Sequence, residues 1–170
     1  MQPEAFSGAL LHVSAHAFIK VALFLCASAI IYRTGATRVE ELRGIGKGMP
    51  VTLWCYTIVS LGLIGIPPAS GFASKWHLAM GALDSGIAVF SWLGPVVLLI
   101  SALLTAGYLL PVTMQGFFPG EGFDASRFEN KEPSYQMLVP LLVFAALTIL
   151  IGLAPNPITD AFLAFAAQVM

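Results

Sequence analysis

Charged residues are scarce in this chain of 170 residues. Lys and Arg together number 8 and Asp and Glu 9, so charged residues make up 10% of the chain, whereas a soluble domain carries about 25%. Hydrophobic residues make up 58%, and the mean hydropathy is +0.85. This balance excludes an ordinary soluble domain and indicates an integral membrane protein that crosses the bilayer several times.

Basic runs and phosphate-binding loops are absent as well. With a formal net charge of -1 and no cluster of Lys or Arg, the chain offers no surface that neutralises a phosphate backbone, so we expect no nucleic-acid partner. No Gly-rich nucleotide loop and no short repeat is present. Residues 1–11 contain Glu4 but no basic residue, which excludes the positive region of a secretory signal. The two cysteines, Cys26 and Cys55, lie in apolar stretches and neither imply nor exclude a disulfide.

Long apolar segments dominate the chain. A helix that crosses a bilayer needs about 20 mainly apolar residues, and four segments provide them. They lie at about 5–32, 51–88, 90–118 and 135–153. The pattern predicts an all-α fold, a polytopic transmembrane bundle of about four spans that forms a single domain over residues 1–170.

The second segment, 51–88, is too long for one straight span, and helix-breaking residues interrupt it. These residues are Gly65, Pro67, Pro68 and Gly71. We therefore predict one discontinuous helix, broken at 65–71. Lipid tolerates such a break only where protein or water satisfies the freed backbone groups, so the break should face the protein interior.

Two polar loops set the expected topology. The loop 33–47 carries four basic and two acidic residues, and the positive-inside rule places such a loop in the cytoplasm. With four spans, the loop 119–133 then lies on the same side. Residues 158–170 are too few to span the bilayer, and we expect this amphipathic or apolar tail at the interface.

Three ionisable residues follow one another at helical spacing in the first segment. His12, His16 and Lys20 occupy positions i, i+4 and i+8, so they share one helical face over about 12 Å. An ionisable group at bilayer depth costs about 2.5 kcal/mol or more, which implies a hydrated cavity or neutral side chains. Because a neutral imidazole accepts a proton at one nitrogen and donates one at the other, the row suits proton relay.

Two alternatives stand beside proton relay for this row. In one, His12 and His16 lie near the membrane surface and the Lys20 side chain extends to the interface. In the other, His12 and His16 form an i, i+4 metal or haem pair. No nearby Cys, Asp or Glu completes that ligand set, so we expect no metal and no cofactor in this chain.

A fourth ionisable residue follows the helix break. Lys75 lies four residues after Gly71, where helix termini and free carbonyl groups create ion sites in transporters. The alternative is an interfacial lysine in a loop between two short helices. His77 is a possible extension of the path, although Trp76 beside it also suits an interfacial belt. Asp84 is either an acid at the exit of the path or a solvated surface residue.

The segments HVSAHAFIKVALFL (His12 to Leu25) and GIPPASGFASKW (Gly65 to Trp76) together resemble a known family. This family comprises the proton-translocating antiporter-like subunits of respiratory NADH:quinone oxidoreductase, Mrp-type cation/proton antiporters and membrane-bound hydrogenases. Its pattern His-x3-His-x3-Lys followed by Gly-Phe-x-x-Lys falls on His12, His16, Lys20 and Lys75. The Ser74-Lys75-Trp76 sequence looks closer to the D-type member of the Mrp antiporters.

The resemblance implies a fold of two inverted repeats, each with a broken helix. The present segments look like the C-terminal part of that fold, so we expect the first repeat to lie outside this chain. The resemblance also implies other membrane subunits as partners, protons and either sodium or potassium as transported ions, surrounding lipid, and a bacterial-type cell membrane as the location.

These observations favour proton translocation, with or without cation antiport, by a subunit of a respiratory or Mrp-type complex. A non-conducting structural subunit is the alternative. If the complex is an enzyme of the NADH:quinone oxidoreductase type, its redox centres lie in other subunits, because flavin and iron–sulfur motifs are absent here.

Overall fold

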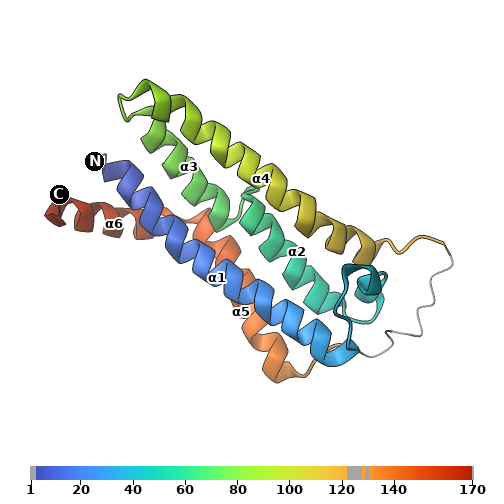
Figure 1. Ribbon diagram of the computed structural model, residues 1–170. Coiled ribbons are helices and arrows are strands. Elements are labelled where there is room, and N and C mark those ends of the chain that lie inside the picture. The colour runs from blue at the N-terminus through green and yellow to red at the C-terminus, as the bar shows by residue number, and fades with distance from the viewer. Residues whose placement is uncertain (1–2, 122–127, 129–130, 170) are drawn as a thin grey trace.

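Helices account for all the regular structure in the described part of the chain. The computed structural model describes residues 3–121, 128 and 131–169. Its elements are α1 (Pro3–Thr34), two short 3-10 helices η1 (Val39–Leu42) and η2 (Ile45–Lys47), α2 (Pro50–Ile64), α3 (Ser70–Leu83), α4 (Ala88–Phe117), α5 (Tyr135–Leu153) and α6 (Asn156–Val169) (Figure 1). The predicted all-α fold is confirmed.

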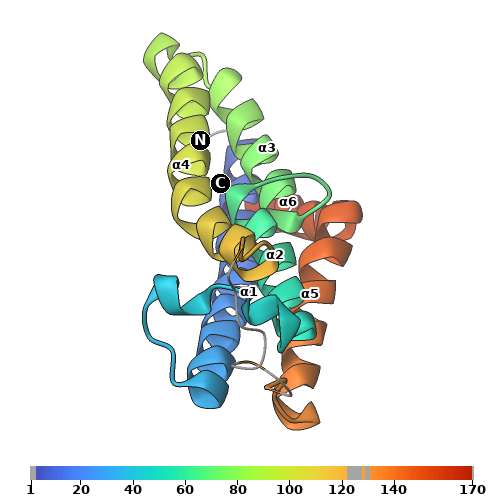
Figure 2. The ribbon, with the colours of Figure 1, turned by 90° about the vertical axis from the view of Figure 1, so that its right-hand side faces the viewer.

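The predicted discontinuous helix is the pair α2 and α3. The two helices follow each other end to end in both ribbon views (Figures 1 and 2), and Gly65 ends α2 in the left-handed conformation with a φ of 93°, which glycine adopts without steric cost. Pro67 and Pro68 lie in the connection, where missing backbone donors break no helical hydrogen bond.

Gly71 does not belong to the break, because α3 already begins at Ser70. A side chain on Gly71 would meet the neighbouring helix: a Cβ there would lie 1.9 Å from the carbonyl oxygen of Gly62. Gly71 thus allows the first turn of α3 to pack on the end of α2. The break itself extends over residues 65–69.

Within the described residues, three helices are long and apolar enough to cross a membrane, namely Ala5–Thr34, Ala88–Phe117 and Tyr135–Leu153. A fourth crossing would follow if Val39–Lys47 and Pro50–Ile64, joined at a bend of 117°, counted as one span. We favour α2 with α3 as the fourth crossing, since the two run end to end and their 15 and 14 residues together reach about 44 Å.

Small residues bring α1 and α3 into close antiparallel contact. A Cβ on Gly8 would lie 2.9 Å from Cβ of His77, and a Cβ on Gly81 would lie 2.6 Å from Cα of Ala5. As residue numbers rise along α3, those of the facing residues on α1 fall. Further along α1, Ile19 contacts the α2 residue Gly62. α1 therefore lies alongside both halves of the broken helix.

The two predicted loops meet at one end of the molecule. Arg33 Nε donates to the carbonyl oxygen of Lys131 at 2.9 Å, and Arg43 Nε donates to the carbonyl oxygen of Pro119. Gly48 packs directly on the Phe128 backbone. Residues 122–127 and 129–130 of the loop 119–133 lie outside the described part of the chain. The contacts place the loops on the same side of the bundle, as the four-span topology predicts.

The last two helices pack against the break and against α1. Near the end of α5, a Cβ on Gly152 would lie 2.0 Å from the carbonyl oxygen of Pro68, so the α5 backbone covers one side of the break. Within α6, the carbonyl oxygen of Thr159 accepts a 3.2 Å hydrogen bond from Ser7, and the Phe165 ring stacks on Phe6. The short tail thus packs on the first turns of α1.

Candidate functional site

Lys75 bridges the two halves of the broken helix. Its ammonium nitrogen donates to the carbonyl oxygens of Leu63 at 3.1 Å and of Ile64 at 2.7 Å. These carbonyls belong to the last turn of α2 and have no partner further along the helix. Because a helix C-terminus carries partial negative charge, it favours a cation at this position. The half-buried lysine thus caps the helix that ends in front of it.

Gly65 makes room for this lysine. A Cβ on Gly65 would lie 2.9 Å from Lys75 Cδ and 3.3 Å from Lys75 Nζ. The left-handed turn at Gly65 and the position of the ammonium group therefore depend on the same missing side chain. The break and the lysine form one local structure, which explains why they occur together in the sequence.

His12 reaches α3 through Ser74. His12 Nδ1 lies 2.9 Å from Ser74 Oγ, and Ser74, which is 0% exposed, donates its own hydroxyl hydrogen to the carbonyl oxygen of Gly71 at 3.1 Å. A serine hydroxyl carries one hydrogen, so the bond to His12 requires Nδ1–H to donate. Nε2 of the ring is then the nitrogen that exchanges a proton in the neutral state.

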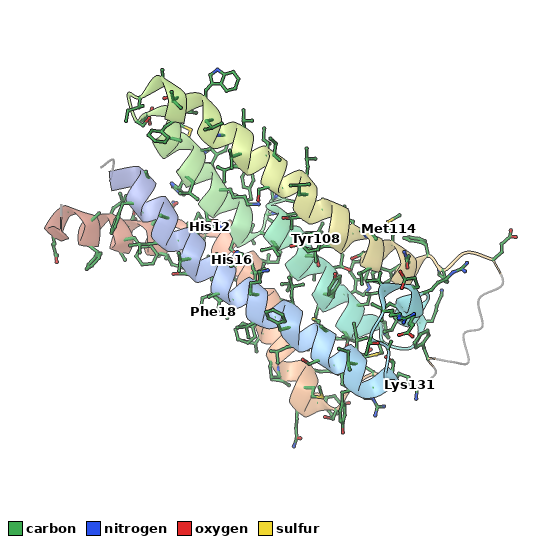
Figure 3. The ribbon with its side chains drawn as sticks, in the orientation of Figure 1. His12, His16, Phe18, Tyr108, Met114 and Lys131 are labelled. Atoms are coloured by element: carbon green, nitrogen blue, oxygen red, sulfur yellow. The ribbon has the colours of Figure 1, made fainter. Side chains whose placement is uncertain are left out.

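His16 follows His12 by one turn of α1, with 5.7 Å between the ring centroids; both residues are labelled in Figure 3. Both imidazoles are half-buried and interact electrostatically with Lys75 on the facing helix. Lys20 interacts electrostatically with His16 and is half-buried one turn further. Since its neighbour Ile19 contacts Gly62, Lys20 lies near the level of the helix break. The four predicted residues thus gather around the break.

The two possible path residues lie apart from this group. His77 is two residues from Lys75, so it points to a different side of α3, where it packs on Gly8 of α1. It shares the side of α3 that carries Ser74, three residues earlier. Asp84 is the exposed C-cap of α3, about 14 Å along the helix axis from Lys75. It lies at the end of the bundle opposite the loops 33–47 and 119–133.

The break is covered by protein on one side only. Ala69 and Ser70 are 2% and 1% exposed, and the α5 backbone packs on them at Gly152. On the other side, Ile66 is 40% exposed and both prolines are exposed. The break is therefore buried, as predicted, on the side that α5 covers. Its opposite side is exposed in this chain.

A carboxylate that is not among the predicted site residues, that of Glu132, lies at the other end of α2. Glu132 Oε1 accepts hydrogen bonds from Thr52 N at 2.9 Å and Thr52 Oγ1 at 2.5 Å, and Oε2 accepts one from Val51 N at 3.1 Å. The backbone donors of a first helical turn lack helical acceptors. Glu132 thus supplies them from a loop some 80 residues away.

Side chains that could bind a metal do not gather in the described ranges. No group of three or more His, Cys, Asp or Glu side chains that could hold a metal ion occurs among residues 3–121, 128 and 131–169. Both cysteines are buried free thiols. The polar side chains around the break are instead two lysines, two imidazoles and a serine hydroxyl, groups whose chemistry allows proton exchange.

The chain is similar to known membrane proteins. A family model described as NADH:quinone oxidoreductase/Mrp antiporter, TM matches residues 1–105, which include α1, the break and Lys75. The chain belongs to this family. It is an integral membrane protein of the group that contains membrane subunits of NADH:quinone oxidoreductase and Mrp antiporter complexes, as the resemblance implied.

Individual members of the family match almost the whole chain. NADH-quinone oxidoreductase subunit N of Desulforudis audaxviator is 37% identical over 159 residues, covering 88% of this chain and 31% of the relative. The D-type Na(+)/H(+) antiporter subunit of Alkalihalophilus pseudofirmus is 30% identical over 169 residues, covering 98% of this chain and 32% of the relative. The chain thus spans about a third of the length of these relatives.

A solved structure shows the same fold. A chain of the Mrp complex from Dietzia sp. DQ12-45-1b superimposes with a TM-score of 0.82 at 22% identity, covering 99% of this chain and 38% of that chain. At this identity the likeness concerns the fold alone. The arrangement of the helices is therefore a fold that the two chains share.

Sequence reasoning missed two kinds of partner at the site. One is the pair of carbonyls, of Leu63 and Ile64, that bind Lys75; a lysine in the first turns after a Gly/Pro break is a signal that could have suggested a helix cap. The other is Ser74. Its bond to His12 depends on how α1 pairs with α3, and sequence spacing does not reveal that pairing.

Proposed function

We propose that this chain is part of a proton-translocating membrane subunit, with Lys75 as the group that gains and loses the transported proton. The bond between the Lys75 ammonium and the last carbonyls of α2 carries the proposal. A lysine held at a helix end in the middle of a broken span can be charged or neutral, whereas arginine at such a site stays charged. Because the ammonium group binds the last carbonyls of α2, the protonation state of Lys75 is coupled to the structure at the end of α2.

The row on α1 provides the next positions of the path. His12, with Nδ1–H held by Ser74, presents Nε2 for exchange. His16 lies between His12 and Lys20, and it faces the same break. A proton leaving Lys75 would pass to this row through the half-buried space between α1 and α3, by way of water or by a direct step between neighbouring groups.

The whole protein acts, in this proposal, inside a multi-subunit complex of a bacterial-type cell membrane. The matched relatives are described as subunits of NADH-quinone oxidoreductase and of an Na(+)/H(+) antiporter. Other membrane subunits would cover the open side of the break, and lipid would cover the apolar outer faces. Protons are the transported ion, and sodium or potassium is a candidate for exchange. Any redox cofactor belongs to partner subunits.

Lys75→Ala and Lys75→Arg test this function. In the full complex reconstituted into vesicles, with proton movement followed by a pH-sensitive dye, both variants should lose at least nine-tenths of the initial rate. Alanine removes the proton-carrying group, and guanidinium does not release its proton near neutral pH. The control is Lys47→Ala, because Lys47 is exposed in the loop at the end of η2 and its removal should leave the rate unchanged.

The same experiment discriminates the structural alternative. A non-conducting subunit predicts that Lys75→Ala, once assembled into the complex at normal amounts, transports at the rate of the unmodified protein. That outcome would remove Lys75 from the path. Loss of the subunit from the complex, measured by its amount after purification, would identify an assembly role instead.

A further inference from the structure

A second row of polar groups leads to Lys75 along α2. Tyr56, Ser60 and Ile64 occupy positions i, i+4 and i+8, and the carbonyl oxygen of Ile64 is the one that binds Lys75 most closely, at 2.7 Å. Residues at this spacing share one helical face. The row therefore extends about 12 Å from the lysine toward the end of the bundle where the two loops meet.

Ser60 is the unusual member of this row. It is 0% exposed, and its Oγ has no hydrogen-bond partner among the described residues. The Tyr56 hydroxyl is close enough to interact with it, but the geometry of a direct hydrogen bond is not met. A buried hydroxyl without a partner is rare in proteins and points to a water or ligand that satisfies it.

Two other buried hydroxyls, those of Thr57 and Thr148, are satisfied within their own helices. Thr57 Oγ1 donates to the carbonyl oxygen of Leu53 at 2.8 Å, and Thr148 Oγ1 donates to that of Phe144 at 2.8 Å. This bond to the preceding turn is the usual solution for Ser and Thr in a helix. Ser60 does not adopt it, so its hydroxyl is available to a group beside the helix.

The row begins at a pocket that reaches the loop side. A pocket of about 190 Å³ is lined by Tyr56 of α2, Val112 of α4 and residues of the segment after α1, including Thr37 and Arg38. This space is large enough for several waters, since one water needs roughly 30 Å³. Seven of its ten lining residues are apolar, and its polar lining consists of Tyr56 itself and of Thr37 and Arg38 in the loop that carries the net positive charge. Tyr56 is thus the residue at which the pocket meets the buried row.

We propose that Tyr56 and Ser60, bridged by water, form the proton route between Lys75 and the loop-side surface. Each hydroxyl accepts a proton on its oxygen and releases its own hydrogen on the other side, so neither residue changes its net charge over a cycle. The last step delivers the proton beside the carbonyls of Leu63 and Ile64, where the lysine nitrogen receives it. This route rests on the proposed function of Lys75 and adds its connection to one membrane surface.

The test uses Ser60→Ala and Tyr56→Phe in the full complex, which remove only the hydroxyls. Each should lower the initial rate of proton movement severalfold, less than the tenfold or greater loss expected of Lys75→Ala. The ratio of rates in H₂O and D₂O should rise, because proton entry becomes limiting. Ser60→Thr keeps a hydroxyl and should restore the rate. Thr57→Val is the matched control, since Thr57 is the adjacent hydroxyl with its own partners.

The outcomes separate this route from the proposed function. If Lys75→Ala abolishes transport while Ser60→Ala and Tyr56→Phe keep both the normal rate and the normal isotope ratio, the route is wrong and the function of Lys75 stands. If Lys75→Ala transports normally, the proposed function fails first. If Ser60→Ala is slow but Ser60→Thr and Thr57→Val are equally slow, packing of α2 explains the loss and the route is again overturned.

Discussion

At the scale of single residues, the site depends on a glycine as much as on a lysine. Gly65 adopts a φ of 93°, and a Cβ on it would lie 2.9 Å from Lys75 Cδ. A side chain at this position would meet both a strained backbone and the stem of the lysine. The capping bond to α2 therefore requires that position 65 carry no side chain.

Gly65→Ala should accordingly impair transport although it changes no titratable group. We expect a stability loss of about 1–2 kcal/mol for a left-handed alanine, and a displaced Lys75 should lower the transport rate severalfold. Gly107→Ala is the control, because Gly107 lies inside α4 with nothing within 4 Å of an added Cβ. It should gain about 0.5–1 kcal/mol. Thermal unfolding and proton movement in the same preparation check both variants, and equal behaviour would contradict this account of Gly65.

The residue scale also shows what sequence can and cannot predict. Helical spacing is enough to predict that His12, His16 and Lys20 share a face, because that relation depends on one helix. The partners of His12 and Lys75 come from other helices or from the backbone, so spacing does not reveal them. The roles of these residues in transport stay predictions until the variants are measured.

At the scale of elements, α2 is a helix with a complementary charge at each end. The Glu132 carboxylate accepts hydrogen bonds from the first turn at Val51 and Thr52, and the Lys75 ammonium donates to the last turn at Ile64. Both contacts oppose the partial charges of the helix termini. Neither charged group belongs to α2 itself, so tertiary structure holds this helix at both ends.

Glu132→Ala should destabilise α2 at its start. The variant leaves three donors of the first turn without their acceptor, which should cost about 1–2 kcal/mol. Thermal unfolding of the purified complex measures this loss, and hydrogen exchange should rise at Val51 and Thr52. Glu121→Ala is the control for charge alone, since the Glu121 side chain is exposed. A loss of the same size in both variants would show that the net charge matters and the cap does not.

Sequence predicts the ends of helices well where residue types that cannot continue a helix occur. The prolines and Gly65 indicate the break because they cannot continue a helix, and the break is where they predict it. Gly71 is different: it lies within α3, since glycine is tolerated in a helix where another backbone approaches closely, here at Gly62. Glycine alone does not tell a break from a close contact. The cap by Glu132 is also invisible in sequence, because some 80 residues separate it from α2.

At the scale of the whole molecule, the helices divide the polar segments between two ends. The loops around Arg33, Arg43 and Lys131 contact one another at one end. The α3–α4 connection with Asp84 lies at the other end, where α1 begins. The break and Lys75 lie between the two ends. This arrangement follows from an antiparallel α1 and α3 and from the continuous α4 that returns to the loop side.

Cysteine labelling tests this division in the membrane. Cys26 and Cys55 are buried, so they should not react with a membrane-impermeant maleimide. In a complex without other accessible cysteines, Thr37→Cys and Ser134→Cys should react from the same side, and Ser85→Cys from the opposite side. The positive-inside rule predicts that the first two face the cytoplasm. Reaction of Thr37→Cys and Ser85→Cys from one side would show that α2 and α3 do not form a crossing.

The sequence predicts the all-α bundle because a low charged fraction and long apolar runs leave few other folds in lipid. It does not predict how the helices pair. The close contacts of α1 with α3 depend on Gly8 and Gly81, whereas Gly107 in α4 has nothing within 4 Å of an added Cβ, and composition does not tell these glycines apart. The packing of α6 on α1 through Ser7 and Thr159 is likewise a matter of three-dimensional fit, which a single sequence does not display.

Because Lys75 caps α2, the structure of the last turn of α2 and the protonation state of Lys75 affect each other. The intact last turn of α2 favours a charged Lys75 by the same coupling free energy with which a charged Lys75 favours the intact turn. A neighbouring subunit that pulls this turn out of alignment would thus release a proton without touching the lysine. The coupling free energy sets the upper limit on how far such a movement could shift the protonation of Lys75.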